Sequence, residues 1–212
     1  PIDPVRFLGN KSSGRQGLAV AAAAARAGAS VRVIAANIDE SVMAALPSGV
    51  EVTRVGSACE MREATMAQVI GADALVMTAA VADFRPEAAQ ASKMKKDPTK
   101  TDAPTLRLVR NPDILSEVGH SDIRPALVVG FAAETGTDEE ILANGADKAA
   151  RKGADYIALN RVGAGVGFGD VPNDIRLLDV GGQIVGRYIG SKDEVAAGLV
   201  AQMAAFLDNL ER

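Results

Sequence analysis

Short apolar runs alternate with longer helical segments along most of this chain, and this order limits the fold more than any other feature. The run at 74–77, A-L-V-M, shows no apolar-polar alternation and follows a helical pattern, as expected of a parallel strand buried on both faces. Strands are expected at 31–35, 50–55, 74–77, 105–109, 126–130 and 155–160, and helices at 18–27, 57–70 and 138–152. We therefore predict an α/β protein with a Rossmann-like, doubly wound and mostly parallel sheet.

The C-terminal part breaks this alternation and predicts an antiparallel hairpin. Apolar and polar residues alternate at 174–180 and at 183–188, and Gly181 and Gly182 between them are a two-residue turn signal. A final amphipathic helix is expected at 192–210. Because the hairpin would leave a strand edge open, we expect a second subunit to cover it in a homodimer.

Length and composition exclude several classes of function. The chain has 212 residues, which suits a single domain at 1–212, and its net charge of −4 gives no general attraction for nucleic acid or acidic membranes. No segment has the apolar length of a membrane span. Cys59 is the only cysteine and His120 the only histidine. One residue of each type is too few for a metal site made of several thiolates and leaves a single candidate for a histidine-based triad. A lone cysteine suits a reducing, cytoplasmic location.

The turn at 10–17, N-K-S-S-G-R-Q-G, comes directly before an alanine-rich segment that is expected to be helical up to Gly28. Free backbone N–H groups at a helix start favour anions, and Ser12 and Ser13 add hydroxyl donors. One of these serines could simply cap the helix. Capping does not explain both serines beside two cationic residues, so we favour phosphate binding.

A group of small and charged residues follows the expected strand at 74–77. Ligands of open α/β sheets bind at the carboxyl ends of the strands, and small residues there let a flat ligand approach the backbone. The alternative is a solvated loop with a lysine run. The residues concerned are Thr78, Ala79, Ala80, Asp83, Lys93, Lys95 and Lys96.

Four further features lie C-terminal to the lysine run. The segment 111–114, N-P-D-I, starts a short helix, which its proline alone would explain. Phe131 ends another buried strand and could either stack on a base or fill the core. Lys148 and Lys152 are four residues apart and share one helix face, where a solvated pair is the default interpretation. Polar, glycine-bearing loops are expected at 97–104 and 161–172.

Five motifs occur in a fixed order: N-K-S-S-G-R-Q-G, A-A-V-A-D-F-R-P, K-M-K-K, N-P-D-I and G-F-A-A-E-T. Over essentially its whole length the chain resembles phosphopantothenoylcysteine synthetase, also called phosphopantothenate-cysteine ligase. That family usually forms the C-terminal half of a bifunctional protein whose other half is a flavin-dependent decarboxylase. Its members begin with a strand and a T-A-G-G-T-type loop before the segment P-I-D-P-V-R, so the resemblance predicts that the domain at 1–212 lacks this strand and loop.

The resemblance implies a ligase of coenzyme A biosynthesis. Its substrates would be 4'-phosphopantothenate, L-cysteine and CTP, with Mg²⁺ as the metal. The carboxylate of 4'-phosphopantothenate would attack CTP to give an acyl-cytidylate and pyrophosphate, and the amine of cysteine would then displace CMP.

The resemblance also implies roles for single residues. Asn10 would act on the acyl-cytidylate and Lys93 on the triphosphate, both as catalytic residues, and Asp83 would contact the ribose or the metal. Together with the anion site of Ser12 and Ser13, the nucleotide contacts would be Met77, Thr78, Ala79, Ala80, Asp83, Lys93, Asn111, Pro112, Asp113, Ile114, Phe131, Lys148 and Lys152.

Two other classes of function stay open on the sequence alone. A nicotinamide-dependent (NAD(P)) reductase would share the fold, but the chain has no G-x-G-x-x-G after a strand. A non-catalytic nucleotide-binding module would need the lysines but not Asn10.

Overall fold

The computed structural model describes residues 1–95, 103–134, 136–161 and 173–210. Most of the loops expected at 97–104 and 161–172 therefore lies outside the described residues. In the part of the chain that is described, no helix is long and apolar enough to cross a membrane. The elements are α1 (Arg15–Arg26), β1 (Arg32–Ala36), α2 (Glu40–Met43), β2 (Glu51–Val55), α3 (Ala58–Gln68), β3 (Ala74–Met77), β4 (Phe84–Pro86), β5 (Leu108–Arg110), α4 (Ile114–Gly119), β6 (Leu127–Glu134), α5 (Asp138–Lys152), β7 (Tyr156–Arg161), β8 (Asn173–Asp179), β9 (Ile184–Gly190) and α6 (Lys192–Leu210).

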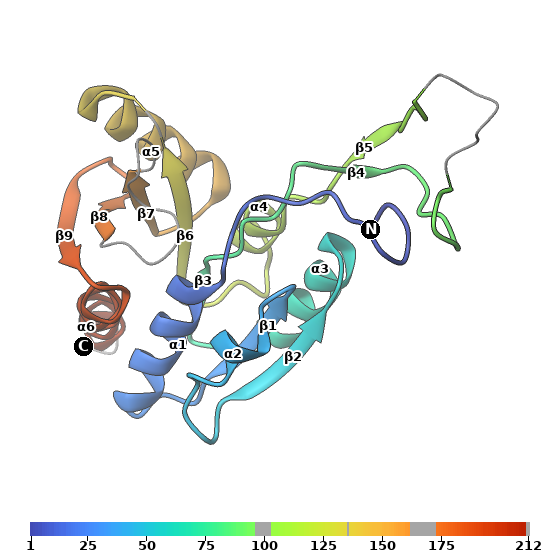
Figure 1. Ribbon diagram of the computed structural model, residues 1–212. Coiled ribbons are helices and arrows are strands. Elements are labelled where there is room, and N and C mark those ends of the chain that lie inside the picture. The colour runs from blue at the N-terminus through green and yellow to red at the C-terminus, as the bar shows by residue number, and fades with distance from the viewer. Residues whose placement is uncertain (96–102, 135, 162–172, 211–212) are drawn as a thin grey trace.

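The central sheet has five strands in the order β3-β6-β7-β8-β9 (Figure 1). Strands β3, β6 and β7 run parallel, whereas β8 and β9 are antiparallel to their neighbours. Two smaller pairs complete the fold: β1 with β2, which are parallel, and β4 with β5, which form an antiparallel ribbon. The α/β class, the mostly parallel sheet and the C-terminal antiparallel hairpin are thus confirmed.

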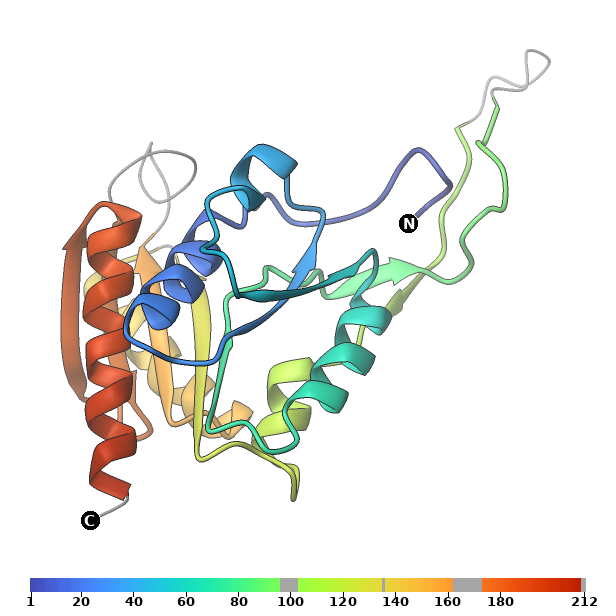
Figure 2. The same cartoon turned by 90° about the horizontal axis from the view of Figure 1, so that it is seen from below.

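Helices cover both faces of the central sheet, as the alternation of elements predicts. On one face, α1 and α6 lie side by side and pack on β6, β7 and β8 through residues such as Val129 and Ile175 (Figure 2). On the other face, α4 and α5 bury Val118 and Ile141 against neighbouring positions such as Ile157 of β7. Successive strand residues point to opposite faces, so the sheet carries a separate hydrophobic cluster on each face.

Strand β3 is less buried than its sequence predicts. All four of its residues are half-buried, whereas the run at 74–77 was expected to be covered on both faces. The reason is its place in the sheet, because β3 pairs with β6 on one side and is the edge strand of the central sheet as described. The predicted lack of the family's first strand and glycine loop remains a prediction.

The β4–β5 ribbon extends away from the rest of the molecule (Figure 1). Pro86 ends β4, which is only three residues long, so no apolar alternation marks this strand in the sequence. A strand was expected at 105–109, and the observed partner is Leu108–Arg110. Helix α2 was not expected either, because a single helical turn is too short to show a periodic pattern. Its N-terminus is capped by the Asp39 side chain, which accepts from the Ser41 N–H at 2.9 Å.

Helices α3 and α4 are joined by an ion pair between Arg62 and Glu117. Arg62 Nε donates to Glu117 Oε2 at 2.7 Å, and a second guanidinium nitrogen contacts the other carboxylate oxygen. This bidentate hydrogen bonding holds the pKa of the Glu117 carboxyl below its ordinary value of 4.5.

The variant Glu117→Gln is expected to lower Tm by about 1 to 3 °C at pH 7, because both partners are partly solvated. The folded-state pKa is lowered, so the stabilisation is present above the unfolded-state value and is lost as the pH falls through the folded-state value. Melting curves of both proteins from pH 7 downwards should therefore converge in acid. Glu63→Gln, at an exposed position of the same helix, is the matched control, and a difference in Tm that persists in acid would contradict the interpretation.

Candidate functional site

The start of α1 lies against the residues that follow two strands of the sheets. A Cβ on Gly17 would collide with the side chain of Thr78, directly after β3, and a Cβ on Gly14 would collide with Ile38, just after β1. Gly14 also has φ 73°, a left-handed conformation that favours glycine. Two glycines therefore allow the turn at 10–17 to approach the carboxyl ends of β1 and β3.

No side chain caps the N-terminus of α1, so the alternative that a serine merely caps this helix is wrong. The N-cap is Gly14, it makes no side-chain capping hydrogen bond, and the first turn holds no acidic residue. Ser12 Oγ accepts from the Gly14 N–H at 3.4 Å, and both Ser12 and Ser13 are exposed. The free N–H groups and positive end of a helix of 12 residues stay available to an anion.

Asn10 is the first residue of this turn, and it is exposed. Its Nδ2 donates to the Val81 carbonyl oxygen at 3.3 Å, which joins the turn to the segment between β3 and β4. Since an amide nitrogen carries two hydrogens, one donor remains for another acceptor.

Asn111 holds the same segment from the other side. Its N–H donates to the Asp83 carbonyl oxygen and its Nδ2 to the Ala82 carbonyl oxygen, both at 2.8 Å, while its Oδ1 accepts from Arg85 at 3.2 Å. The side chain of Asn111 is thus used to fix the loop. Asp83, Ala79 and Ala80 are exposed residues of the connection after β3.

Lys152 reaches from the end of α5 to Asp113 at the start of α4. The two side chains form an ion pair in which Lys152 is 15% exposed, and Asp113 also caps α4 by accepting from the Ser116 N–H at 3.2 Å. Burial works to raise the pKa of Asp113, but the hydrogen bonds from Lys152 and Ser116 outweigh it and lower the pKa. Pro112 is half-buried beside them, whereas Ile114 is fully buried in the core.

Lys148 pairs with Glu134 at the end of β6, with 3.0 Å between Nζ and Oε1. The two lysines of α5 are therefore partly buried and paired with carboxylates, and the default interpretation of a solvated pair is wrong. Phe131 is half-buried and packs against the core on the α1 side of the sheet, and its stacking on a base stays a prediction. Lys93 and Lys95 are exposed, and Lys96 lies outside the described residues.

These contacts form one connected rim. Asn10 touches the segment after β3, Asn111 holds that segment to the start of α4, and Asp113 joins α4 to Lys152. Met77 and Thr78, at the end of β3, are half-buried beneath it. The rim offers amide donors, a free helix start and cations, which together can bind a polyanionic substrate and stabilise negative charge.

The sequence interpretation missed a polar cluster beside this rim. Asn173 is buried at the start of β8, and its Nδ2 donates to Gln16 Oε1 at 2.7 Å while its Oδ1 accepts from Lys192 at 3.2 Å. At the end of β7, the buried Oδ1 of Asn160 has no hydrogen-bond partner among the described residues. A buried acceptor without a partner is uncommon and fits a donor supplied by a ligand. In the sequence these residues are isolated Asn and Gln side chains. Such side chains also occur in ordinary turns, so they do not mark a site.

Metal binding would need more than the side chains of this site. In the described ranges, no three His, Cys, Asp or Glu side chains gather in a metal-binding group. Asp83 is an exposed carboxylate beside the rim, and Mg²⁺ is usually held by one or two carboxylates together with substrate phosphates and water. The site therefore fits Mg²⁺ that arrives with a phosphorylated substrate.

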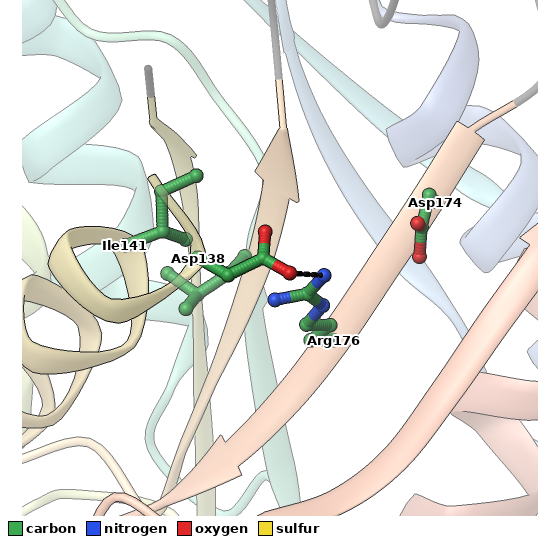
Figure 3. Close-up of a pocket in the computed structure, with 5 residues that line it drawn as sticks. Asp138, Ile141, Asp174 and Arg176 are labelled. Carbon is green, nitrogen blue, oxygen red and sulfur yellow. Dashed lines mark hydrogen bonds and ion pairs between the residues drawn. The ribbon is translucent and has the colours of Figure 1, made fainter. Parts of the chain in front are cut away.

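Two hollows lie away from the rim. One, between α5 and β8, is lined by Asp138, Ile141, Asp174 and Arg176, and Arg176 pairs with Asp138 at 2.8 Å (Figure 3). Its volume of about 10 Å³ is about that of one water molecule, too small for a substrate. The other is a groove of about 310 Å³ between α1 and α6, lined mainly by alanines such as Ala23 and Ala201.

Comparison with known proteins adds independent information. Residues 1–207 match the family described as DNA/pantothenate metabolism flavoprotein C-terminal domain. The chain is 42% identical to the coenzyme A biosynthesis bifunctional protein CoaBC of Mycobacterium tuberculosis (strain ATCC 25618 / H37Rv), over 98% of this chain and 50% of that protein. It is 44% identical to the protein of the same name from Vibrio parahaemolyticus, over 86% of this chain and 44% of that protein. The chain thus spans about half the length of the curated relatives it matches.

A solved structure has a similar fold. It is described as the C-terminal domain of coenzyme A biosynthesis bifunctional protein CoaBC, and it superposes with a TM-score of 0.75 at 28% sequence identity. The match covers 98% of this chain and 90% of that chain.

Proposed function

The chain belongs to the family of DNA/pantothenate metabolism flavoprotein C-terminal domains, and on this basis we propose that it is the CTP-dependent ligase that joins 4'-phosphopantothenate to L-cysteine. Its relatives are coenzyme A biosynthesis proteins, so a role as an enzyme of that pathway follows from the family. Because those relatives are bifunctional and about twice as long, we further propose that the domain works linked to a flavin-dependent decarboxylase.

One observation carries the proposal: the connected rim that joins Asn10, the end of β3, the start of α4 and Lys152 of α5. A ligase of this class must bind a triphosphate and then stabilise charge on an acyl group. The uncapped start of α1 and the lysines suit the first task, and the amide of Asn10 suits the second.

In the first step, a carboxylate oxygen of 4'-phosphopantothenate would form a bond to the α-phosphorus of CTP. The bond from that phosphorus to the bridging oxygen would break, and pyrophosphate would leave with the electron pair. Lys93, Lys148 and Lys152 would neutralise the triphosphate so that one anion can attack another. Lys148 and Lys152 would have to exchange their contacts with Glu134 and Asp113 for phosphate oxygens.

In the second step, the amine of cysteine would attack the acyl carbon of the acyl-cytidylate. A C–N bond would form, the C–O bond to the phosphate would break, CMP would leave, and the amine would lose a proton. Asn10 would donate its remaining N–H to the acyl oxygen as negative charge develops there.

Mg²⁺ would be held by Asp83 together with phosphate oxygens, and when bound it would supply further neutralisation of the triphosphate. The base would lie over Ala79 and Ala80, whose exposed positions leave backbone groups free to pair with one base edge. Exposed backbone donors and acceptors have a fixed order, so we expect the site to discriminate between nucleobases.

The decisive experiment is turnover of 4'-phosphopantothenate and L-cysteine with CTP, followed by detection of pyrophosphate and of the amide product. We expect both products with CTP and a larger rise in Tm with CTP than with ATP, because one base edge fits the backbone at Ala79 and Ala80. ATP, UTP and NADPH serve as parallel arms. Equal melting shifts with CTP and ATP would contradict base selection, a shift with NADPH alone would favour a reductase, and nucleotide binding without pyrophosphate release would indicate a non-catalytic module.

A further inference from the structure

Two residues of the N-terminal segment hold the backbone of Met94. The Met94 N–H donates to Asp3 Oδ2 at 3.2 Å, and Arg6 Nη2 donates to the Met94 carbonyl oxygen at 3.1 Å. Both backbone hydrogen-bonding groups of Met94 therefore end on the same ion pair, that of Asp3 with Arg6. Met94 lies between Lys93 and Lys95.

The carboxylate of Asp3 is held in this contact by several hydrogen bonds. Its side chain is fully buried, and its Oδ1 accepts from the N–H groups of Val5 and Arg6, each at 2.9 Å. Its Oδ2 accepts from Arg6 Nε at 3.0 Å as well as from Met94. The hydrogen bond from the Arg6 side chain, outweighing burial, holds the pKa of Asp3 far below its usual range, so the carboxylate stays charged.

Further contacts tie the same two segments together. The Gln90 N–H donates to the Ile2 carbonyl oxygen at 2.9 Å, four residues before Met94. On the other side, Asn10 donates to Val81. The N-terminal segment thus holds the connection after β3 at Val81, at Gln90 and at Met94.

The backbone around Lys93 needs such support because residues 87–95 belong to no helix or strand. A lysine on an irregular loop samples many positions, and ordering it at the moment of binding costs entropy. A backbone fixed in advance removes part of that cost. We propose that Asp3 is a positioning residue, which fixes Met94 and thereby holds Lys93 where its ammonium group meets an anionic substrate. The anchoring of Met94 stands on the geometry alone, whereas the role of Lys93 rests on the proposed function.

The test is the variant Asp3→Asn in the full chain. Asparagine keeps an oxygen for the Val5 and Arg6 N–H groups, but its amide nitrogen cannot accept from Met94 or from the Arg6 side chain. We expect the Met94 amide hydrogen to exchange with solvent about tenfold faster or more, measured by mass spectrometry, because the substitution removes the hydrogen bonds that hold it. The KM for CTP should rise by about tenfold with a smaller change in kcat, since the effect falls on binding.

A matched control and a double variant make the test specific. Asp179→Asn alters a carboxylate that also accepts hydrogen bonds within its own turn, from the N–H groups of Gly181 and Gln183, and it should change neither Met94 exchange nor the KM for CTP. If Asp3 acts through Lys93, then adding Asp3→Asn to Lys93→Ala should change the KM by less than about twofold.

Unchanged exchange at Met94 in Asp3→Asn would overturn the proposal. So would faster exchange accompanied by fully additive effects of Asp3→Asn and Lys93→Ala on the KM, because Asp3 would then act independently of Lys93. The exchange measurement needs no turnover, so a chain without ligase activity would refute the proposed function and still show whether Asp3 anchors the loop.

Discussion

The variant Asn10→Asp is expected to bind CTP and release pyrophosphate while amide formation with cysteine falls by about a hundredfold or more. Loss of one hydrogen-bond donor to a developing negative charge typically costs about 2.7 to 4 kcal/mol of transition-state stabilisation. Aspartate also places a like charge beside the acyl oxygen, which adds to the effect. Separate assays of pyrophosphate release and of the amide product measure the two half-reactions.

The fold should survive this substitution. Asn10 is exposed and is not the cap of α1, since Gly14 holds that position. A carboxylate near the start of a helix is also favoured by the helix dipole. The substitution removes one exposed hydrogen bond, the 3.3 Å bond from Asn10 Nδ2 to the Val81 carbonyl oxygen. An unchanged melting temperature would show that any kinetic effect is local.

Two further variants separate the possible roles of Asn10. Asn10→Ala removes the donor without adding charge and should impair the second half-reaction, though less than aspartate does. Asn209→Asp makes the same chemical change at an exposed position near the end of α6 and should leave both half-reactions unchanged. If the two half-reactions fell equally in Asn10→Asp, Asn10 would belong to triphosphate binding, and if neither fell, its role would be limited to holding Val81.

The order of elements was predictable from the sequence because burial and helix signals act locally. The strand at 74–77 and the helices at 138–152 and 192–210 were predicted with the observed bounds. The elements that were missed are short: β4 contains a proline and depends on β5 for its pairing, and α2 is one turn held by its cap. Their stability comes from partners distant in sequence or from a single side chain, and neither leaves a periodic pattern.

The candidate site was predictable only as a set of segments. The sequence indicated that Asn10, the end of β3, the segment 111–114 and the lysines of α5 carry charge or donors. It could not show that Asn111 fixes the loop, or that Lys152 contacts Asp113, because these contacts join residues far apart in the chain. Asp3 was not singled out either, because P-I-D-P-V-R gives no sign that its aspartate is buried. Buried polar contacts depend on tertiary packing, which leaves no periodicity to detect.

The variant Lys152→Ala is expected to weaken the use of CTP by roughly ten- to 150-fold in kcat/KM. A hydrogen bond to a charged group contributes about 1.5 to 3 kcal/mol, and the upper part of this range applies where the donor is shielded from water. Lys152 meets that condition because it is 15% exposed, and its present partner Asp113 could give way to a phosphate oxygen. Arg151→Ala removes a neighbouring cation whose side chain is 59% exposed, so it should change kcat/KM by less than about twofold.

A tether between α5 and α4 is the competing explanation for Lys152, and Asp113→Asn tests it. Asparagine removes the charge partner of Lys152 but can still cap α4, because its oxygen accepts from the Ser116 N–H as the carboxylate does. If Lys152 only joins the two helices, Lys152→Ala and Asp113→Asn should lower Tm equally and leave the KM for CTP unchanged. If it contacts phosphate, Lys152→Ala alone should raise the KM strongly. Asp113→Asn should then leave the KM unchanged or lower it, because the lysine no longer has to leave a carboxylate in order to meet the triphosphate.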